Sequence, residues 1–264
     1  SGIGLACARL LLARGYHVVL LARDPGRLER ARAALGEDRA VDCLCVDVAD
    51  ATSVKEAFAL IETRPGRVDW LITCAGIVEP GLFRDLDLAD HLAQMNTNYF
   101  GTLHAVRAAV PLVSRGGGGR ITLVSSAAAF VGIAGYAGYA PGKFAVRALA
   151  EILRLELAGA GIVVSVACPP DTQTPQLAAE RPKRPLVTRL ISEQGGVMSA
   201  EEVAAKMIAG AEKGAFMLAP SRMISLLAWF HSLYRPVLAW QQRRALARSS
   251  GEGPAIAERD RRRP

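Results

Sequence analysis

The sequence predicts an α/β fold in which a doubly wound parallel sheet carries helices on both faces. Short apolar runs, several of them rich in valine and isoleucine, alternate with longer segments whose apolar residues recur at helical spacing. The short runs are continuously apolar, which is typical of parallel strands buried on both faces. A glycine turn at Gly2 and Gly4 precedes the first helical segment, and such turns bind phosphate at helix N-termini.

The apolar pattern predicts each element in turn. Helical spacing predicts helices over residues 4–13, 27–35, 54–62, 88–112 and 144–157. Continuous apolar runs predict strands over residues 18–22, 43–47, 70–74, 121–125 and 162–167, with a last short strand over 216–218. Ser199 followed by Glu202 has the spacing of a capping box, so a further helix is predicted to begin there.

Two segments interrupt this alternation. Residues 169–197 are rich in proline and charge and follow a predicted strand's carboxyl end, where open α/β sheets bind ligands. We interpret them as a lid or substrate loop, with a passive linker as the alternative. Residues 223–240 are apolar but interrupted by His231, Arg235 and Pro236, and fall short of the roughly 20 apolar residues of a spanning helix. They predict an interfacial helix or helix pair, or else an ordinary packing or dimer helix.

Positive charge is concentrated at one end of the chain. Of a net charge of +7, +6 falls in residues 221–264, where nine arginines stand against three acidic residues. A nucleic-acid-binding protein would spread basic residues over a folded face, so this pattern favours peripheral contact with an anionic membrane surface. The five cysteines form no Cys-x-x-Cys pair and the four histidines are scattered. We therefore expect free thiols, no metal site, and a cytoplasmic protein at the cytoplasmic face of a membrane.

These observations divide the chain into three parts. Residues 1–220 form the predicted sheet domain, which includes the segment 169–197. Residues 221–250 form an apolar and basic helical extension. Residues 251–264 are polar and charged, and we expect them to be disordered.

The start of the chain carries the residues of a dinucleotide site. Gly2 and Gly4 allow the backbone to approach a pyrophosphate at a helix N-terminus. After the strand over 18–22, an acidic residue would accept the ribose 2′-hydroxyl of NAD. Arg23 stands there instead, and its guanidinium suits a 2′-phosphate, so the cofactor is predicted to be NADPH. Asp47 ends the next predicted strand, where it either meets the adenine edge or caps a helix.

The middle of the chain carries the residues of a proton-transfer site. Ser126 follows a predicted strand, and Tyr139 and Lys143 come after it with the spacing Tyr-x-x-x-Lys. Side chains four residues apart share one face of a helix, so the phenol and the ammonium group should lie together. A neighbouring ammonium group favours the phenolate and lowers the tyrosine pKa from about 10. We therefore expect Tyr139 to act as a general acid.

Taken together, these motifs resemble the short-chain dehydrogenase/reductase family over residues 1–220. The matching pieces are SGIG at 1–4, CAG at 74–76, Asn98 in NYFG, VSS at 124–126 and YAPGK at 139–143. The resemblance implies a Rossmann-like fold, an NADP-dependent oxidoreductase and a homo-oligomer. Cys74 departs from the pattern, because the family usually has asparagine before Ala-Gly.

The resemblance also implies a role for each matching residue. Ser126 would hold the substrate carbonyl oxygen and Tyr139 would donate the proton. Lys143 would bind the nicotinamide ribose and tune Tyr139, while Asn98 would hold a water that links Lys143 to solvent. The cofactor contacts are expected at Ser1, Gly2, Ile3, Gly4, Arg23, Asp47, Ala75, Gly76, Tyr139, Lys143, Pro169 and Thr172.

A narrower resemblance lies in CPPDTQTPQLAAERPKRPLVTRLISE at residues 168–193, which is similar to the corresponding loop of 3-ketodihydrosphingosine (3-dehydrosphinganine) reductases. It implies NADPH-dependent reduction of the C3 ketone of 3-oxosphinganine to sphinganine, a step of sphingolipid synthesis. A lipid substrate agrees with the apolar, basic C-terminal part. Two alternatives remain: a reductase of another apolar ketone, such as a steroid, retinoid or acyl chain, and a non-catalytic dinucleotide-binding protein at the membrane surface.

The family places a strand ahead of the glycine turn. After that strand come Thr-Gly and two or three further residues, and only then the residue that corresponds to Ser1. We therefore expect the first, central strand of the sheet to be missing from this chain, as in an N-terminally truncated sequence. The open sheet should bind NADPH poorly, and a chain extended upstream should bind it well.

Overall fold

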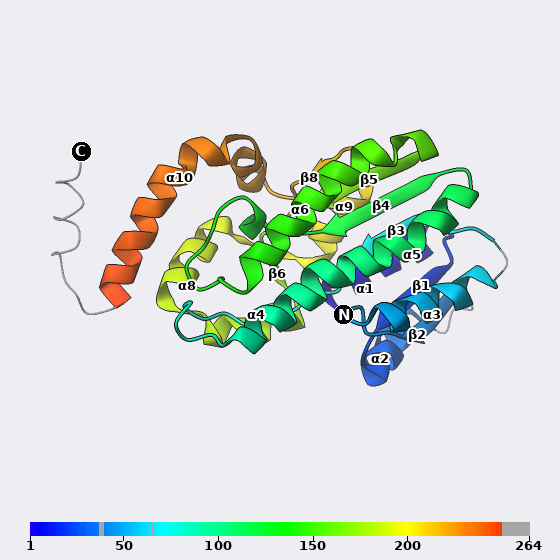
Figure 1. Cartoon of the computed structure of the whole chain (residues 1–264), viewed down its shortest axis with the longest axis horizontal. Helices are drawn as coiled ribbons and strands as arrows, with labels where there is room; N and C mark the ends of the chain where they lie inside the picture. Colours follow the sequence, from blue (N-terminus) through cyan, green and yellow to red (C-terminus); the bar gives the residue numbers. More distant parts are fainter. Residues whose placement is uncertain (37–39, 65, 250–264) are drawn as a thin grey trace.

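The computed structural model describes residues 1–36, 40–64 and 66–249, so the tail expected over 251–264 lies outside the described residues. Strands and helices alternate along the chain (Figure 1). The paired strands of the described residues run parallel to one another. The predicted α/β class with a parallel sheet is therefore confirmed.

The strands of the main sheet lie in two hydrogen-bonded groups. The first group pairs β1 (Val18–Ala22) with β2 (Val41–Cys45). The second has the order β3 (Trp70–Thr73), β4 (Gly119–Val124), β5 (Ile162–Ala167), β8 (Met217–Leu218). A separate short pair joins β6 (Asp171–Gln173) to β7 (Val197–Ser199).

Between β1 and β3 the sheet is interrupted. Within the described part of the chain these two strands are not hydrogen-bonded to each other. Both line one large cavity of about 1720 Å³, and α1 (Gly2–Leu12) is the first element of the chain. Each strand therefore turns an edge of unpaired backbone groups toward the cavity. The interruption lies where the sequence analysis expects the central strand.

Helices cover both faces of the sheet. Successive side chains of a strand point to opposite faces, so their packing partners show what covers each face. On β4, Ile121 and Leu123 pack in the cluster that includes α5 (Gly101–Arg115) and α6 (Tyr139–Glu156), while Val124 packs in the cluster of α1 and α9 (Ala200–Glu212). Figure 1 shows α5 and α6 side by side across one face. The predicted doubly wound arrangement is confirmed.

The remaining helices complete the layers and the connections. Their bounds are α2 (Pro25–Leu35), α3 (Ala51–Glu62), α4 (Leu88–Met95), α7 (Pro175–Glu180), α8 (Leu186–Ser192) and α10 (Arg222–Ser249). Short 3₁₀ turns lie at Ala127–Ala129, Ala158–Ala160, Arg181–Lys183 and Glu193–Gly195. The predicted capping box at Ser199 and Glu202 is confirmed as the start of α9.

The helix predicted over 88–112 is observed and reaches Arg115, but it is not one regular α-helix. The structure divides it into α4, a π-helical turn at Asn96–Phe100, and α5. Asn98 binds the backbone of Ile77 in this turn, and a Cβ at Gly101 would lie 2.7 Å from Cγ2 of Val48. Tertiary contacts therefore shape this bend, and π-helical turns of this kind are frequent at functional sites.

Most other boundaries differ from the prediction by a few residues, and two of the differences bear on the site. Helix α6 begins at Tyr139, five residues before the predicted start, because Pro141 lies in the first turn, where a backbone N–H has no intrahelical partner. Strand β2 ends at Cys45, so Asp47 lies in the turn that follows it. The segment 169–197 contains β6, α7 and α8 in addition to turns.

The C-terminal segment forms one long helix, α10, which continues through Pro236. Ile224 and Ala245 are buried, whereas Trp229 is 83% exposed and Leu233 76% exposed. One side of α10 therefore packs on the protein and another faces outward. None of the helices in the described ranges combines the length and apolar character that crossing a membrane requires.

Candidate active site

Tyr139 and Lys143 occupy the first turn of α6, on the same side of the helix. The Nζ atom of Lys143 lies 5.6 Å from the centroid of the Tyr139 ring. Lys143 is only 5% exposed, and its Nζ donates a hydrogen bond of 3.1 Å to the carbonyl oxygen of Val124 at the end of β4. The helix thus brings a phenol and an ammonium group to the carboxyl end of the central strands.

Ser126 lies beside them. It follows β4, and its Oγ accepts a hydrogen bond of 3.2 Å from the backbone of Ala128, which caps the short turn Ala127–Ala129. The side chain of Ser126 is also close enough to Tyr139 to lower the pKa of the tyrosine. The serine, the tyrosine and the lysine therefore converge in one place, as the sequence analysis expects.

The pKa of Tyr139 is raised, and the expectation that Lys143 lowers it is wrong for this structure. Burial is the largest cause of the rise; the Ser126 side chain lowers the pKa, and the charge of Glu180 raises it. Lys143 is not among the main causes of the shift in this pKa. Burial also lowers the pKa of Lys143, to about 8.

Asn98 is fully buried in the π-helical turn. Its Oδ1 accepts a hydrogen bond of 2.8 Å from the backbone N–H of Ile77, and its Nδ2 donates one of 2.9 Å to the Ile77 carbonyl. The side chain thus fixes the segment after β3. The role of Asn98 in holding a water for Lys143 stays a prediction.

Ser125 is a positioning residue that the sequence analysis missed. It is buried, and its Oγ donates a hydrogen bond of 2.7 Å to the backbone carbonyl of Lys143. This bond ties the first turn of α6 to the end of β4. Its place directly before Ser126 was the only hint in the sequence. The hydrogen bond itself could not be predicted, because a side chain that binds a distant backbone carbonyl leaves no sequence pattern.

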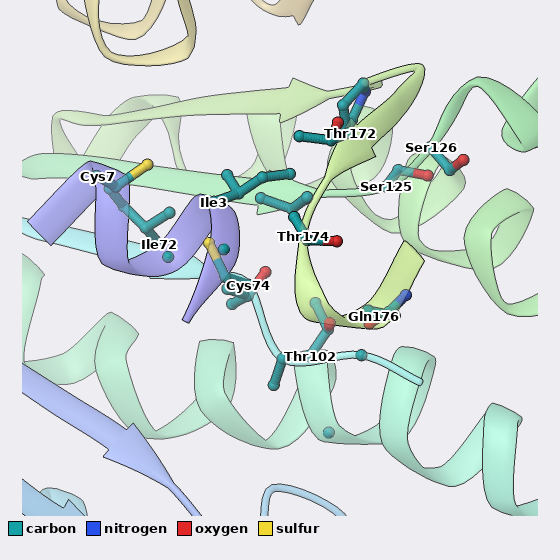
Figure 2. Close-up of a pocket in the computed structure, with 18 of the residues that line it drawn as sticks. Ile3, Cys7, Ile72, Cys74, Thr102, Ser125, Ser126, Thr172, Thr174 and Gln176 are labelled. Carbon is teal, nitrogen blue, oxygen red and sulfur yellow. The ribbon is translucent and has the colours of Figure 1, made fainter. Parts of the chain in front are cut away.

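The N-terminus of α1 forms another wall of the same cavity. Figure 2 shows Ile3, Cys74 and Thr174 around this helix start. Gly2 has a φ of +55°, and a Cβ there would lie 2.9 Å from Cγ2 of Thr174. Glycine is therefore required by both conformation and space, and the first N–H groups of α1 stay accessible to an anion.

The segment after β3 fits a cofactor that passes close to the backbone. A Cβ on Gly76 would lie 3.2 Å from Oδ1 of Asn98 and 3.5 Å from Nζ of Lys143. Ala75 and Gly76 both line the cavity. A side chain at Gly76 would therefore crowd Asn98 and Lys143.

At the adenosine end, Arg23 is exposed and lines the cavity beyond β1. The neighbouring Asp24 caps α2 by accepting a hydrogen bond of 3.0 Å from the backbone of Arg27. Asp47 does not cap α3, because Asp50 does so. The helix-capping alternative for Asp47 is therefore wrong, and its carboxylate accepts a hydrogen bond of 2.9 Å from the backbone of Ala49.

Residues that come directly after β5 form another wall of the cavity. The carbonyl of Pro169 accepts a hydrogen bond of 3.0 Å from the backbone of Ala127. Thr172 is buried, and its Oγ1 donates one of 2.9 Å to the carbonyl of Pro170. Of the expected catalytic and cofactor residues, all except Asn98 line the cavity of about 1720 Å³.

A buried ionic network beside Tyr139 was not foreseen. Arg184 holds Asp171 through two hydrogen bonds of 2.5 and 2.8 Å, and its Nε donates one of 2.7 Å to Oε1 of Glu180. The hydroxyl of Tyr136 donates a 2.5 Å hydrogen bond to the same Oε1. Glu180 and Arg184 are four residues apart, but nothing in their spacing shows that they meet Asp171 and Tyr136.

Comparison with known proteins gives one consistent result. A family model described as short chain dehydrogenase matches residues 1–185. A 3-dehydrosphinganine reductase of Danio rerio is 38% identical over 222 residues, which is 82% of this chain and 67% of that protein. A 3-ketodihydrosphingosine reductase of Bos taurus is 36% identical over the same shares of the two chains.

Solved structures agree in fold. A short-chain dehydrogenase from Sphingobium yanoikuyae in complex with NADPH has a TM-score of 0.76 at 24% identity, covering 90% of this chain and 91% of that one. A gluconate 5-dehydrogenase from Burkholderia cenocepacia in complex with NADP and tartrate has a TM-score of 0.73 at 25% identity, covering 83% and 89%.

Proposed function

The chain belongs to the short-chain dehydrogenase/reductase family, and on that premise we propose that it reduces the C3 ketone of 3-oxosphinganine to sphinganine with NADPH. The convergence of Ser126, Tyr139 and Lys143 in one cavity is the observation that carries the reaction. The similarity to 3-dehydrosphinganine and 3-ketodihydrosphingosine reductases supports the substrate.

The side chains divide the chemistry between them. The ketone oxygen accepts hydrogen bonds from Ser126 Oγ and the Tyr139 hydroxyl, which lie close to each other. NADPH, when bound, supplies the hydride for C3. Tyr139 then gives its proton to the alkoxide oxygen, and positive charge on Lys143 favours the resulting phenolate. The net change is one hydride and one proton added to the carbonyl.

Arg23 supports NADPH over NADH. It lies at the cavity beyond the end of β1, and Asp24, the acidic residue next to it, is engaged as the cap of α2. A guanidinium can bind the 2′-phosphate through two hydrogen bonds. Two solved structures of similar fold, one in complex with NADPH and one with NADP, support the same choice.

The shape of the cavity supports a substrate with a long chain. From Tyr139 it extends to the inner side of α10, where Leu227 and Leu238 line it. Val131 and Ile133 add apolar surface between these points. Alkyl carbons gain about 0.8 kcal/mol for each buried CH₂ group, so this wall suits the hydrocarbon tail of a sphingoid base.

The outer side of α10 supports peripheral contact with the cytoplasmic face of a membrane. Trp229, Leu233 and Trp240 are each more than half exposed. Residues 222–249 contain five arginines and no acidic residue. Exposed aromatic and aliphatic side chains next to basic ones are typical of helices that lie in an anionic interface.

Exposed apolar side chains on α6 and just before α5 support self-association. Phe100 precedes α5, and Phe144, Ile152 and Leu155 lie on α6, with Leu155 74% exposed. Two such helices from each of two copies would form a four-helix contact. Light scattering of the wild type and of Leu155→Glu tests this; a dimer that persists unchanged in the variant excludes this face.

Substrate identity is tested by following NADPH consumption with 3-oxosphinganine, a steroid ketone and a short ketone. We expect turnover mainly with the first. Tyr139→Phe should abolish it, whereas Tyr99→Phe, which also removes one phenolic hydroxyl, should not. Preference for the steroid would favour another apolar ketone, and turnover that survives in Tyr139→Phe would remove the enzymatic assignment.

A further inference from the structure

The network of Asp171, Glu180 and Arg184 has one negative charge more than it can neutralise. Two carboxylates share a single guanidinium, and the Arg184 side chain is only 2% exposed. The pKa of Tyr136 is raised, mainly by burial, so this phenol stays neutral and does not change the charge of the network. An uncompensated charge away from water is costly, so the network favours a cation nearby.

Glu180 is the member through which a cation can be bound. Both hydrogen bonds that it accepts, from Tyr136 and from Arg184, end on Oε1. Among the described residues no donor reaches Oε2. This oxygen is also not completely buried. Glu180 is 7% exposed and lines the cavity. A nearly buried carboxylate therefore keeps one free oxygen at the cavity wall.

Asp171 differs from Glu180 in this respect. Its Oδ1 and Oδ2 each accept a hydrogen bond from Arg184, so its charge is already matched by the guanidinium. The excess charge is thus concentrated on Glu180, and Arg184 and Tyr136 fix the carboxylate in place.

The network lies next to the reacting groups. The rings of Tyr136 and Tyr139 are 5.3 Å apart between centroids. Glu180 and Asp171 are close enough for their charges to raise the pKa of Tyr139. A cation held by Glu180 would therefore lie beside the ketone that Tyr139 protonates.

We propose that Glu180, fixed by Arg184 and Tyr136, binds a protonated amine on the carbon next to the reacting ketone and so selects 2-amino ketones. The inference rests on the proposed reduction at Tyr139 and adds the group that recognises the substrate amine. The ammonium would also offset the carboxylates' effect on Tyr139 and stabilise the phenolate left after proton transfer. The substrate would thereby assist its own reduction.

Glu79 provides a matched comparison. It also lines the cavity, but both of its carboxylate oxygens accept hydrogen bonds from Lys183, at 2.8 and 2.9 Å. Its charge is matched one to one by an exposed lysine. Glu79→Gln thus removes a cavity carboxylate without removing an excess negative charge.

The first experiment uses the wild type alone, so it needs no variant to fold. It compares kcat/KM for 3-oxosphinganine, for the same chain with hydrogen in place of the amine, and for its N-acetyl derivative. We expect a preference of about tenfold to hundredfold for the free amine, the range of one charge-assisted hydrogen bond. Equal reduction of the three ketones would overturn the proposal while leaving the reductase function in place; reduction of none would overturn the function.

The second experiment measures the same preference in Glu180→Gln and Glu79→Gln. The preference for the free amine should fall at least tenfold in Glu180→Gln, mainly through KM, and stay unchanged in Glu79→Gln. In the wild type the KM for 3-oxosphinganine should rise with pH as the substrate amine loses its proton, and that rise should vanish in Glu180→Gln. A preference that falls equally in both variants, or in neither, contradicts the role of Glu180.

Discussion

The hydroxyl of Ser125 donates a 2.7 Å hydrogen bond to the backbone carbonyl of Lys143, eighteen residues further along the chain. The carbonyl belongs to the first turn of α6, which carries Tyr139 and Lys143. The bond therefore fixes the two proposed catalytic side chains relative to Ser126, the next residue after Ser125. Positioning of this kind matters because a displacement of about 1 Å can cost about a hundredfold in rate.

Ser125→Ala should lower kcat about tenfold or more and destabilise the protein by about 1–3 kcal/mol, since a buried carbonyl loses its donor. Ser165→Ala is the matched control, because Ser165 Oγ donates a 2.7 Å hydrogen bond to the backbone carbonyl of Ala215, outside the first turn of α6. Denaturant unfolding and NADPH-consumption rates of the two variants decide the matter. We expect both variants to lose a similar amount of stability, and only Ser125→Ala to lose kcat. Equal kcat values in the two variants would show that the Ser125 bond is merely structural.

Lys143 predicts how stability depends on pH. Burial lowers its folded-state pKa from 10.5 to about 8. Between these two values the unfolded chain binds the proton and the folded chain does not, so stability rises with pH. Compared with Lys143→Met, the wild type should therefore gain about 2–3 kcal/mol from pH 7 to pH 10.5. Urea unfolding of both proteins without cofactor measures the difference, and parallel pH profiles would contradict it.

Arg23 predicts the cofactor preference. In Arg23→Glu the carboxylate would repel the 2′-phosphate, so the Kd for NADPH should rise about tenfold to a hundredfold while that for NADH changes little. Arg107→Glu is the control, since Arg107 is exposed but does not line the cavity. Fluorescence titration with both nucleotides measures the four affinities. A similar weakening in the two variants would mean that Arg23 acts only through the overall charge.

The sequence predicted those features that local patterns determine. The strands at Val18–Ala22 and Ile162–Ala167 were predicted at their observed bounds, because continuous β-branched runs between turns have few other structures available. The helix over 88–112 was predicted whole, because the π-helical turn depends on Asn98 reaching the backbone of Ile77. That contact joins segments 21 residues apart and leaves no periodicity.

The same limit applies to the site. The helical spacing of Tyr139 and Lys143 predicted their proximity, whereas the direction of the Tyr139 pKa depends on burial, which spacing does not report. Likewise, Glu180 meets Tyr136 only because α7 lies against the segment that precedes α6. Charge partners that come from separate segments need the tertiary structure to be found.

The outer side of α10 predicts a membrane-binding defect. Replacing Trp229 and Leu233 by serine should weaken binding to vesicles that contain phosphatidylserine about tenfold or more, because both side chains are mostly exposed and apolar. Leu60→Ser, on the exposed side of α3, removes a leucine that is 55% exposed and should have no effect. Sedimentation with the vesicles measures both. Loss of kcat without loss of binding would instead assign α10 to the substrate cavity alone.

The interrupted sheet predicts a gain of both stability and cofactor affinity when a strand is supplied. β1 and β3 each present an unpaired edge to the cavity, and a parallel strand placed between them would satisfy both edges and lead into the glycine turn at Gly2. A short segment of valine and isoleucine, joined to Ser1 through Thr-Gly and two or three further residues, should raise Tm and lower the Kd for NADPH about tenfold or more. The same segment with proline at alternate positions is the control, because proline cannot donate the ladder hydrogen bonds. If both segments change Tm and Kd equally, the gain comes from added apolar surface, and the backbone edges of β1 and β3 do not limit cofactor binding.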